Sequence, residues 1–557
     1  MDQAITTHKA TRGSEWWRSG VIYQIYPRSF ADANGDGIGD LKGIEQKLDS
    51  LSALGIDAVW LSPFFTSPQK DAGYDVANYV DVDPLFGTLA DFDAMLAKAH
   101  SLGIRVMIDL VPNHTSDQHQ WFQKALAAKP GSPEREFYHF KYGLGENGEL
   151  PPNNWVSMFG GPAWTRVIER DGTPGQWFVH LFDSSQPDLN WSNEKVQEAF
   201  EGIFRFWLDR GVDGFRVDQP HAMAKAKGLP DHPYVAEAGA GFIEGRENPP
   251  MWFQEEVHPI FRRWRKMLES YGGDRAMCGE AYVYPLSLMA QWVRPDEFHQ
   301  TFNFRFLDAG WDPKKLFDAI NESFEAFDGV GAPSTWVLNN HDVIRHASRF
   351  GGSYGRTTAS DGVGPNQPQP DNALGLTIAK GATLFMLALP GASYLYQGEE
   401  LGLPEHTTLE DEFRQDPTFT RTKGTRVGRD GCRVPLPWDQ SSDSSGFSET
   451  GKAWLPQPES YRGLARSMQE QDASSTLALY KQALSLRKNL ELGEGSFGWV
   501  AGYTGPESLA YENSRVRVIY NFGPEPIDLG SSEILISSQP LIGGQLETNS
   551  CVWVRAR

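Results

Sequence analysis

The sequence predicts a (β/α)8 barrel, with a loop-rich subdomain inserted after the third strand and an all-β domain at the C-terminus. Three observations predict this fold class. Eight short apolar runs alternate with amphipathic helical patterns, the alternation breaks after the third run, and the chain ends in closely spaced short strands. Buried parallel strands are near-continuously apolar, and eight strand–helix repeats indicate a closed barrel.

The predicted barrel strands lie in the first 400 residues. They span residues 21–26, 58–61, 106–111, 214–218, 276–280, 301–306, 335–342 and 392–400. Between them, apolar side chains recur at helical spacing. Two clear examples are Leu89, Phe92, Met95, Leu96 and Ala99, and Val196, Phe200, Ile203, Phe204 and Trp207.

The breaks in this alternation predict the domain organisation. Residues 112–187 are too long and too loop-rich for an ordinary strand–helix connection, so we expect an inserted subdomain, with the barrel formed by 14–111 and 188–490. Residues 402–465 are polar and irregular and predict an elaborated loop region. Residues 497–557 alternate short strands with turns and predict a C-terminal β-sandwich domain.

The composition is that of a soluble globular protein. The chain has 557 residues, 40% hydrophobic and 22% charged. Its net charge of -21 argues against nucleic acid or an anionic membrane as a partner. The N-terminus lacks a signal-peptide pattern, no apolar run could span a membrane, and the three cysteines are far apart. We therefore expect a cytoplasmic protein without disulfide bonds, either a monomer or a homodimer. The many aromatic residues could fill the core or stack on sugar rings.

Polar residues concentrate at the carboxyl ends of the predicted strands, where (β/α)8 enzymes have their active sites. These residues are Asp109, Asn113, His114, Arg216, Asp218, Glu280, His341 and Asp342. A single carboxylate could simply cap the next helix. Three carboxylates at three strand ends, with an arginine and histidines beside them, instead indicate a catalytic site.

The residue types at these strand ends favour acid–base and nucleophilic chemistry on a neutral substrate. The sequence has no phosphate-binding glycine motif and no Cys/His metal cluster. Glycoside cleavage uses one carboxylic acid to protonate the leaving oxygen and one carboxylate at the anomeric carbon. A nearby anion raises the pKa of the acid and keeps it protonated.

Several segments carry a resemblance to a known family. DLVPNH (109–114), GFRVD (214–218), GEAYV (279–283) and NNHD (339–342) resemble the four signature regions of the α-amylase family of retaining glycoside hydrolases. GVIYQIYPRSFADANGDGIGDLKGI, AVWLSPFFTSP, DAGYDVANY, YQGEELGLPE and GRDGCRVPLPW resemble its α-glucosidase and oligo-1,6-glucosidase branch. The fold of that family agrees with the prediction from the strand pattern.

The resemblance implies roles for the catalytic residues. Asp218 corresponds to the nucleophile, Glu280 to the general acid and later base, and Asp342 to a third carboxylate that holds sugar hydroxyls. Arg216 lies two residues before Asp218, on the same face of the strand, and can keep it ionised.

The resemblance also implies how the sugar is bound. His114 and His341 are expected to hydrogen-bond sugar hydroxyls, and Tyr74 to stack on the sugar ring. Asp71 and Arg429 resemble the pair that closes the pocket around the terminal glucose, which would make the enzyme exo-acting. Phe159 is expected either in the pocket wall or in the core.

Gln219 departs from the pattern of the branch, which usually has valine, alanine or threonine after the nucleophile. We expect its side chain to border the +1 subsite and contact the leaving sugar. Pro220 suits the first turn of a helix over PHAMAKAKG and predicts an extended backbone at Gln219.

The motif DANGDGIGD (32–40) indicates a cation site. Its oxygen ligands at alternate positions and its sixth-position glycine match the first half of an EF-hand loop, although Gly43 stands where that loop needs glutamate. The alternative is a plain Asp-Gly turn. The resemblance implies structural Ca²⁺ or Mg²⁺, with no organic cofactor. Its ligands would be Asp32, Asn34, Asp36, the Ile38 carbonyl and Asp40.

We therefore expect a retaining, exo-acting α-glucosidase that acts on short α-glucosides. A transglucosidase or sucrose-type isomerase is the alternative, because a sugar can intercept the covalent intermediate. Sucrose isomerases of this branch carry an arginine-rich segment where this chain reads FNFRFLDAG (302–310), which favours hydrolysis. Relatives that serve as transporter subunits carry a membrane helix and lack the catalytic residues, unlike this chain.

Overall fold

The computed structural model describes residues 7–10, 13, 15–233, 249–272, 274–352 and 361–556. Its centre is a sheet of eight parallel strands. In spatial order they are β12 (Gln300–Thr301), β11 (Ala276–Gly279), β10 (Gly214–Val217), β6 (Arg105–Leu110), β3 (Ala58–Leu61), β2 (Val21–Ile25), β14 (Ala392–Tyr396) and β13 (Thr335–Val337).

The first and last strands of this order meet at a seam. The Asn303 N–H, just after β12, donates to the carbonyl of Thr335 in β13 at 3.2 Å. The sheet is thereby rolled into a nearly closed barrel, and the predicted (β/α)8 fold class is confirmed.

The sixth predicted strand, 301–306, is wrong over most of its length. The strand ends at Thr301, and the short helix α7 (Phe304–Leu307) follows. The side chain of Asn303 accepts a hydrogen bond from the Phe306 N–H at 3.2 Å and so caps this helix. A run of aromatic residues is compatible with either a strand or a buried helix, and here the cap decides.

The seventh and eighth strands are shorter than the predicted 335–342 and 392–400. β13 ends at Val337, and the chain then turns at Asn340, whose side chain accepts the Asp342 N–H at 2.8 Å. β14 ends at Tyr396, because Gly398 adopts a φ of 88° and starts the 3-10 helix η6 (Glu399–Leu401).

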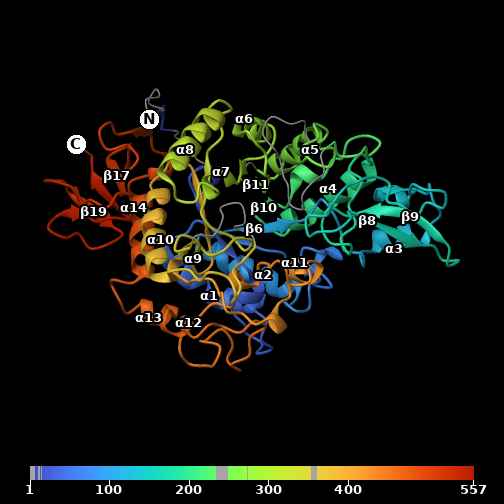
Figure 1. Cartoon of the computed structure of the whole chain (residues 1–557), viewed down its shortest axis with the longest axis horizontal. Coiled ribbons are helices and arrows are strands. Elements are labelled where there is room, and N and C mark those ends of the chain that lie inside the picture. Colours follow the sequence, from blue (N-terminus) through green and yellow to red (C-terminus); the bar gives the residue numbers. More distant parts are fainter. Residues whose placement is uncertain are drawn as a thin grey trace.

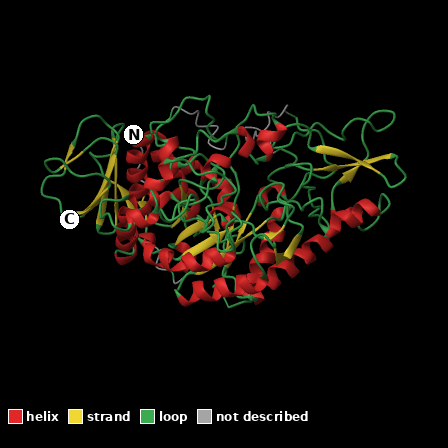
Figure 2. Ribbon diagram, turned by 90° about the horizontal axis from the view of Figure 1, so that it is seen from below, coloured by secondary structure: helices red, strands yellow, loops and turns green. Residues whose placement is uncertain are grey.

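Helices cover the outside of the barrel (Figures 1 and 2). The long ones among the described residues are α1 (Leu41–Leu54), α2 (Leu89–Ser101), α4 (Glu194–Asp209), α5 (Val257–Glu269), α8 (Pro313–Asp328), α10 (Asn372–Leu387) and α14 (Thr476–Asn489). Shorter helices are α6 (Leu286–Met289), α9 (His346–Arg349), α11 (Pro417–Arg421), α12 (Ser460–Gly463) and α13 (Arg466–Gln469). The predicted apolar faces of α2 and α4 are buried, apart from Leu89, which is partly buried at the start of α2.

Side chains fill the interior of the barrel. One buried cluster contains Ile22, Ala58, Trp60, Met107, Cys278, Val337 and Tyr394 from strands around the barrel, together with Phe302, which directly follows β12. The barrel is therefore a packed core with a site at one end and is not a pore.

The segment inserted after β6 folds against the barrel as a small separate sheet. It contains α3 (Gln120–Ala127) and the antiparallel strands β7 (Phe140–Lys141), β8 (Trp164–Ile168) and β9 (Pro174–Val179) in the order β7-β9-β8. A short hairpin, β4 (Phe65–Thr66) and β5 (Asn78–Val82), follows β3 and carries Asp71 and Tyr74 in its loop.

The C-terminal residues form a six-stranded antiparallel sheet at the opposite end of the molecule from β8 and β9 (Figure 1). Its order is β1 (Thr7–His8), β15 (Phe497–Trp499), β16 (Ser508–Asn513), β17 (Val516–Asn521), β21 (Ser550–Arg555) and β19 (Ile534–Ser537). A two-stranded sheet, β18 (Ile527–Asp528) with β20 (Gln545–Leu546), packs against it. Trp553 Nε1 donates to the Leu384 carbonyl at 3.0 Å, which joins this sheet to α10. The contribution of β1 from the N-terminus is not predicted by the sequence pattern. Positions 14 and 557 of the predicted domain boundaries lie outside the described residues.

Two further expectations concern the whole chain. No helix among the described residues is long and apolar enough to cross a membrane. Cys278, Cys432 and Cys551 are all buried and unpaired.

Candidate active site

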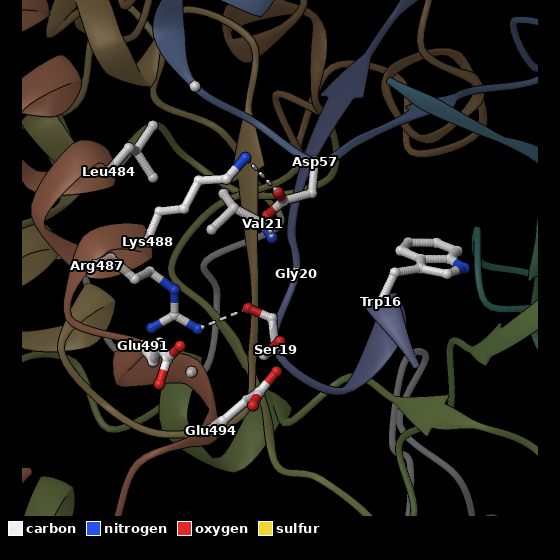
Figure 3. A pocket seen from close by; sticks show the side chains of 12 residues that line it. Trp16, Ser19, Gly20, Val21, Asp57, Leu484, Arg487, Lys488, Glu491 and Glu494 are labelled. Atoms are coloured by element: carbon white, nitrogen blue, oxygen red, sulfur yellow. Dashed lines mark hydrogen bonds and ion pairs between the residues drawn. The ribbon is translucent and has the colours of Figure 1, made fainter. Parts of the chain in front are cut away.

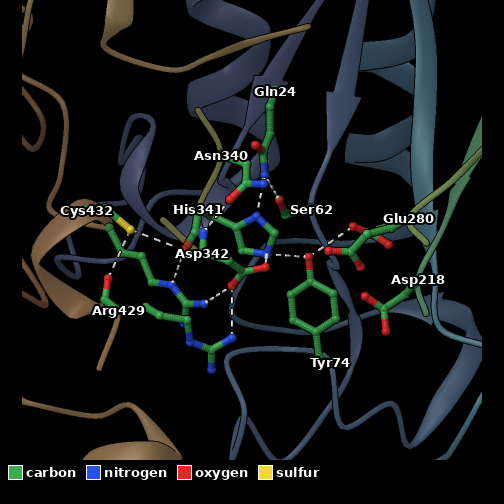
Figure 4. A network of polar contacts seen from close by, with 12 residues as sticks. Gln24, Ser62, Tyr74, Asp218, Glu280, Asn340, His341, Asp342, Arg429 and Cys432 are labelled. Atoms are coloured by element: carbon green, nitrogen blue, oxygen red, sulfur yellow. Dashed lines mark hydrogen bonds and ion pairs between the residues drawn. The ribbon is translucent and has the colours of Figure 1, made fainter. Parts of the chain in front are cut away.

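Four carboxylates meet at the carboxyl ends of the barrel strands. Asp109 lies at the end of β6, and Asp218 and Glu280 directly follow β10 and β11. Asp342 lies in the loop after β13, close to this group (Figure 4). Asp109, Asp218 and Glu280 are buried, and Asp342 is half-buried. Since the register of parallel strands brings their carboxyl ends to one edge, residues more than 200 positions apart share one site.

Arg216 pairs with three of these carboxylates. Its Nη1 lies 2.8 Å from Asp109 Oδ1 and 2.8 Å from Asp218 Oδ1, and its Nη2 lies 2.5 Å from Glu280 Oε2. The guanidinium group is 1% exposed and lies over the ring of Trp60, 4.9 Å from its centroid. One cation therefore holds three acids together, and the predicted pairing of Arg216 with Asp218 is present.

The buried acids differ in how readily they ionise. Burial raises the pKa of Asp218 to about 7, although Arg216 opposes that rise. Burial raises the pKa of Glu280 well above its usual range, and the charges of Asp218 and Asp342 add to the effect. Glu280 therefore keeps its proton, and in the hydrogen bond between the two side chains it donates to Asp218. One acid and one base stand side by side.

Asp342 is held in the opposite state. Arg433 Nη2 lies 2.8 Å and Arg429 Nη1 2.9 Å from Asp342 Oδ1. Burial disfavours the charge, but the guanidinium groups of Arg429 and Arg433 outweigh it and hold the pKa of Asp342 far below its usual range. Asp342 is therefore a permanent anion beside the pair of Asp218 and Glu280.

A chain of hydrogen bonds orders the floor of the site (Figure 4). Gln24 Nε2 lies 2.7 Å from His341 Nδ1, His341 Nε2 lies 2.6 Å from the Tyr74 hydroxyl, and that hydroxyl donates to Asp109 Oδ2 at 3.1 Å. With Gln24 donating to Nδ1, the proton of His341 sits on Nε2. Burial lowers the pKa of His341 well below its usual range, so the ring is neutral.

Asp71 and Arg429, the predicted pocket pair, are in contact. Arg429 Nη2 donates to Asp71 Oδ1 at 3.1 Å, and Gln186 Nε2 donates to Asp71 Oδ2 at 3.0 Å. Gln186 also lies 3.2 Å from Nε2 of His114, a neutral histidine whose pKa burial lowers to about 3. The guanidinium group of Arg429 lies 5.4 Å from the centre of the Phe159 ring. Asp71, His114, Phe159 and Arg429 thus lie around one side of the site.

Gln219 corrects the sequence analysis in two ways. Its backbone is left-handed, with φ 43° and ψ 44°, and is not extended as Pro220 suggested. The segment after it is the three-residue 3-10 helix η4 (Pro220–Ala222) and not a helix over PHAMAKAKG. The left-handed region costs a residue other than glycine about 1–3 kcal/mol, so packing elsewhere enforces it. Its side chain Nε2 donates to Glu280 Oε2 at 3.0 Å.

Sequence reasoning missed several residues of the site. Arg433 binds Asp342, and Asp416 Oδ2 lies 2.5 Å from Arg429 Nε. Lys225 Nζ lies 2.8 Å from Asp188 Oδ2, and both side chains are fully buried. Arg433 closes the GRDGCR motif and could have been selected with Arg429. Nothing in the sequence around Asp416 or Lys225 distinguishes them from surface residues.

The DANGDGIGD loop lies between β2 and α1. Asp32 accepts the N–H groups of Gly35 and Gly37, both at 2.7 Å, and Asp40 caps α1 through the Gly43 N–H at 2.6 Å. Asn34 and Asp36 accept N–H groups two residues further on. No group of three His, Cys, Asp or Glu side chains in the described part of the chain is arranged to hold a metal ion. The loop offers hard oxygen donors, the kind that Ca²⁺ and Mg²⁺ take.

A cavity of about 210 Å³ lies at the other end of the barrel (Figure 3). It is lined in part by Val21 and Asp57, at the starts of β2 and β3. Both cationic side chains that line it have partners, since Lys488 Nζ lies 3.6 Å from Asp57 Oδ1 and Arg487 donates to the Ser19 carbonyl at 3.1 Å. The amino-terminal face of such barrels contributes stability and not catalysis, so the active site is at the carboxylates.

Comparisons with known proteins agree with this geometry. Residues 24–495 match the family model described as the catalytic domain of alpha amylase. The chain is 38% identical to a probable alpha-glucosidase of Rhizobium meliloti, over 92% of this chain and 90% of that protein. It is 35% identical to an oligo-1,6-glucosidase of Heyndrickxia coagulans, over 86% of each. The crystal structure of an alpha-glucosyl transfer enzyme superposes with a TM-score of 0.83 at 37% identity, over 98% of this chain and 100% of that one. The fold, the strand-end carboxylates and the family match lead to one conclusion: this chain belongs to the α-amylase family of glycoside hydrolases.

Proposed function

We propose that the protein is a retaining, exo-acting α-glucosidase that removes the terminal glucosyl residue from the non-reducing end of short α-glucosides. The observation that carries the proposal is the pairing of protonated Glu280 with Asp218, with Arg216 bound to both. A carboxylic acid and a carboxylate in contact provide the proton donor and the nucleophile that a retaining mechanism needs.

In the first step, Asp218 attacks the anomeric carbon and forms the glycosyl–enzyme bond. The bond from that carbon to the leaving oxygen breaks, and this oxygen takes the proton of Glu280. Negative charge is lost from Asp218 and appears on Glu280, while Arg216 contacts both side chains throughout. The cation therefore stabilises the pair before and after the transfer.

In the second step, Glu280 acts as the base. It takes a proton from a water molecule whose oxygen attacks the anomeric carbon, and the bond to Asp218 breaks. Both acids return to their starting states. Asp342 stays ionised because Arg429 and Arg433 bind it, and its charge favours the positive character that develops on the sugar ring.

The proposed preference for a terminal glucose rests on Arg429. It binds Asp71, Asp342 and Asp416 at once, so it ties the β4–β5 loop to the loops after β13 and β14. These groups present carboxylates and a cation to sugar hydroxyls, and Phe159 borders the same guanidinium group. A wall of this kind on one side of the site leaves room for a chain end and blocks an internal position.

The test is hydrolysis of p-nitrophenyl α-glucoside by the wild-type protein and by Asp218→Asn. We expect the variant to lose at least about a thousandfold in kcat/KM, since it lacks the nucleophile. Equal activity of the two proteins would refute the assignment. A panel of disaccharides that differ only in linkage then identifies the natural substrate class.

Transglucosylation is the second candidate, supported by the similarity to an α-glucosyl transfer enzyme. A sugar hydroxyl would replace water in the second step, with Glu280 as base in both cases. Residues 302–310, which read FNFRFLDAG, favour hydrolysis over sucrose isomerisation. Product analysis at high maltose or sucrose concentration separates the activities, because a transferase yields longer or rearranged glucosides in place of free glucose.

We also propose that the DANGDGIGD loop binds structural Ca²⁺ or Mg²⁺. Side-chain oxygens of Asp32, Asn34, Asp36 and Asp40 and the Ile38 carbonyl occur within nine residues and would supply the ligands. The ion would stabilise the loop and would take no part in the reaction.

A further inference from the structure

Gln219 follows the proposed nucleophile but contacts the proposed acid. Its Nε2 donates to Glu280 Oε2 at 3.0 Å, and Nη2 of Arg216 lies 2.5 Å from the same oxygen. An amide N–H and a guanidinium N–H are both donors. Glu280 Oε2 therefore accepts two hydrogen bonds, which makes it the carbonyl oxygen of the protonated side chain. The acid proton is left on Oε1.

The strained backbone explains how the side chain reaches Glu280. The Asp218 N–H is bonded to the Leu110 carbonyl at 2.8 Å, and the Ala222 N–H to the Gln219 carbonyl at 2.9 Å. The chain is thus held on both sides of Gln219 while φ is 43°. A residue with an extended backbone at this position would point its side chain in another direction. Strain of this kind occurs where the surrounding structure enforces a functional geometry.

We propose that Gln219 is a positioning residue for the general acid, which it holds with Oε2 as an acceptor and with the reactive proton on Oε1. The role rests on the proposed function, in which Glu280 protonates the leaving oxygen. It differs from the contact with the leaving sugar that the sequence suggests. The two roles predict different kinetics.

The first experiment varies the need for a proton. When maltose is cleaved, the proton of Glu280 must reach the glycosidic oxygen as its bond to the anomeric carbon breaks. When α-glucosyl fluoride is cleaved, fluoride departs as an anion and needs no proton from Glu280. Gln219→Met keeps the length of the side chain but removes the donor.

We expect kcat/KM of Gln219→Met to fall about 10- to 100-fold for maltose, a part of the 10²–10⁴-fold contribution of general acid catalysis. For α-glucosyl fluoride we expect a fall of less than about threefold, because the nucleophile and Arg216 are unchanged. A purely structural role would reduce both values alike.

The second readout is the pH profile. The alkaline limb of kcat/KM reports the pKa of the acid in the free enzyme. A hydrogen bond from Gln219 favours the ionised form of Glu280 and so lowers its pKa. Its removal in Gln219→Met should shift the alkaline limb for maltose to higher pH.

Controls keep the outcomes distinct. If Gln219→Met does not fold, Gln219→Asn replaces it, because asparagine tolerates a positive φ and its amide is one methylene too short for Glu280. Equal losses for both substrates, or no loss for either, would overturn the proposal. An altered ranking of disaccharide linkages with an unchanged maltose-to-fluoride ratio would overturn it as well and assign Gln219 to the leaving sugar. A wild-type protein inactive on both substrates would refute the proposed function itself, and this role with it.

Discussion

Arg421 and Asp183 form an ion pair between two segments that are more than 200 residues apart, with Nη1 3.0 Å from Oδ1. Arg421 also donates from Nη2 to the Gly160 carbonyl at 2.7 Å. Gly160 directly follows Phe159, whose ring borders Arg429. The pair therefore holds the inserted segment and the loop after β14 together beside the proposed pocket.

Loss of this contact should weaken substrate binding. In Arg421→Met we expect KM for a disaccharide to rise about threefold to tenfold. An ion pair that is partly exposed to solvent contributes roughly 1 kcal/mol to the stability of the contact. We expect kcat to change little, because Arg421 bonds to Asp183 and Gly160 and not to the catalytic carboxylates. Steady-state kinetics measure both values. Arg210→Met is a matched control, because Arg210 is similarly exposed and pairs with Asp93 at 2.8 Å on the surface. An unchanged KM in Arg421→Met would show that the pair does not shape the pocket.

The stability of the fold should fall as pH rises because of Glu399. Burial raises the pKa of this side chain to about 8 from an ordinary value of 4.5. Between these two values the folded protein keeps a proton that the unfolded chain has released, so stability declines as pH increases through that window. Glu399→Gln removes the titration. The difference in melting temperature, variant minus wild type, should therefore be more positive at about pH 9 than at about pH 5.

The neighbouring glutamate gives a control for this experiment. Glu400 Oε1 lies 3.0 Å from Arg466 Nη1, and both side chains are buried. Glu400→Gln should destabilise the protein at both pH values, because it removes the buried carboxylate closest to the buried Arg466 cation. A pH-independent effect of Glu399→Gln would contradict the prediction.

Removal of one side chain of the buried Lys225–Asp188 pair should destabilise the fold more than removal of both. Lys225 Nζ also donates to Asn113 Oδ1 at 2.9 Å, so it links the segment after η4 to the loop after β6. Lys225→Met leaves the Asp188 charge buried and unpaired, which costs about 3–5 kcal/mol. The double variant Lys225→Met/Asp188→Leu should recover most of that loss. Calorimetric melting of the three proteins checks this, and a double variant no more stable than the single one would argue against a charge effect.

Removal of a bound divalent cation should lower the melting temperature, because a ligand that binds only the folded state stabilises it. We expect EDTA to lower it in the wild-type protein, added Ca²⁺ to restore it, and Asp36→Asn to abolish the difference. Asp171→Asn is the control, since Asp171 makes a similar exposed turn contact with the Thr173 N–H at 2.9 Å. A melting temperature insensitive to EDTA and Ca²⁺ would leave the loop as a plain Asp-Gly turn.

The barrel and its carboxylates could be predicted because the information is local. An apolar run that ends in a carboxylate, as GFRV does before Asp218, specifies both a buried strand and the end where its side chains are free. The fold then brings such ends together, so Asp218 and Glu280 meet although each is read separately from the sequence. The family resemblance supplied the roles, which the strand pattern alone does not.

The rest depends on contacts between distant segments. Arg433 and Asp416 belong to irregular loops, and only folding places them around Arg429. The sixth strand was overpredicted because aromatic residues suit a strand and a buried helix equally. Gln219 was misjudged because the preference of a residue before proline is weak compared with hydrogen bonds that hold the chain on both sides.

The seam of the barrel has a consequence for how the molecule opens. β12 has only two residues, and it meets β13 through the bond from the Asn303 N–H to the Thr335 carbonyl. A ladder this short protects few amides, and local opening begins where backbone hydrogen bonds are few. Deuterium should therefore enter the amides of this edge before those of β10, which is paired on both sides. The ring of eight strands should therefore open first at this seam, while β6 and β10, whose carboxyl ends position Asp109 and Asp218, stay paired.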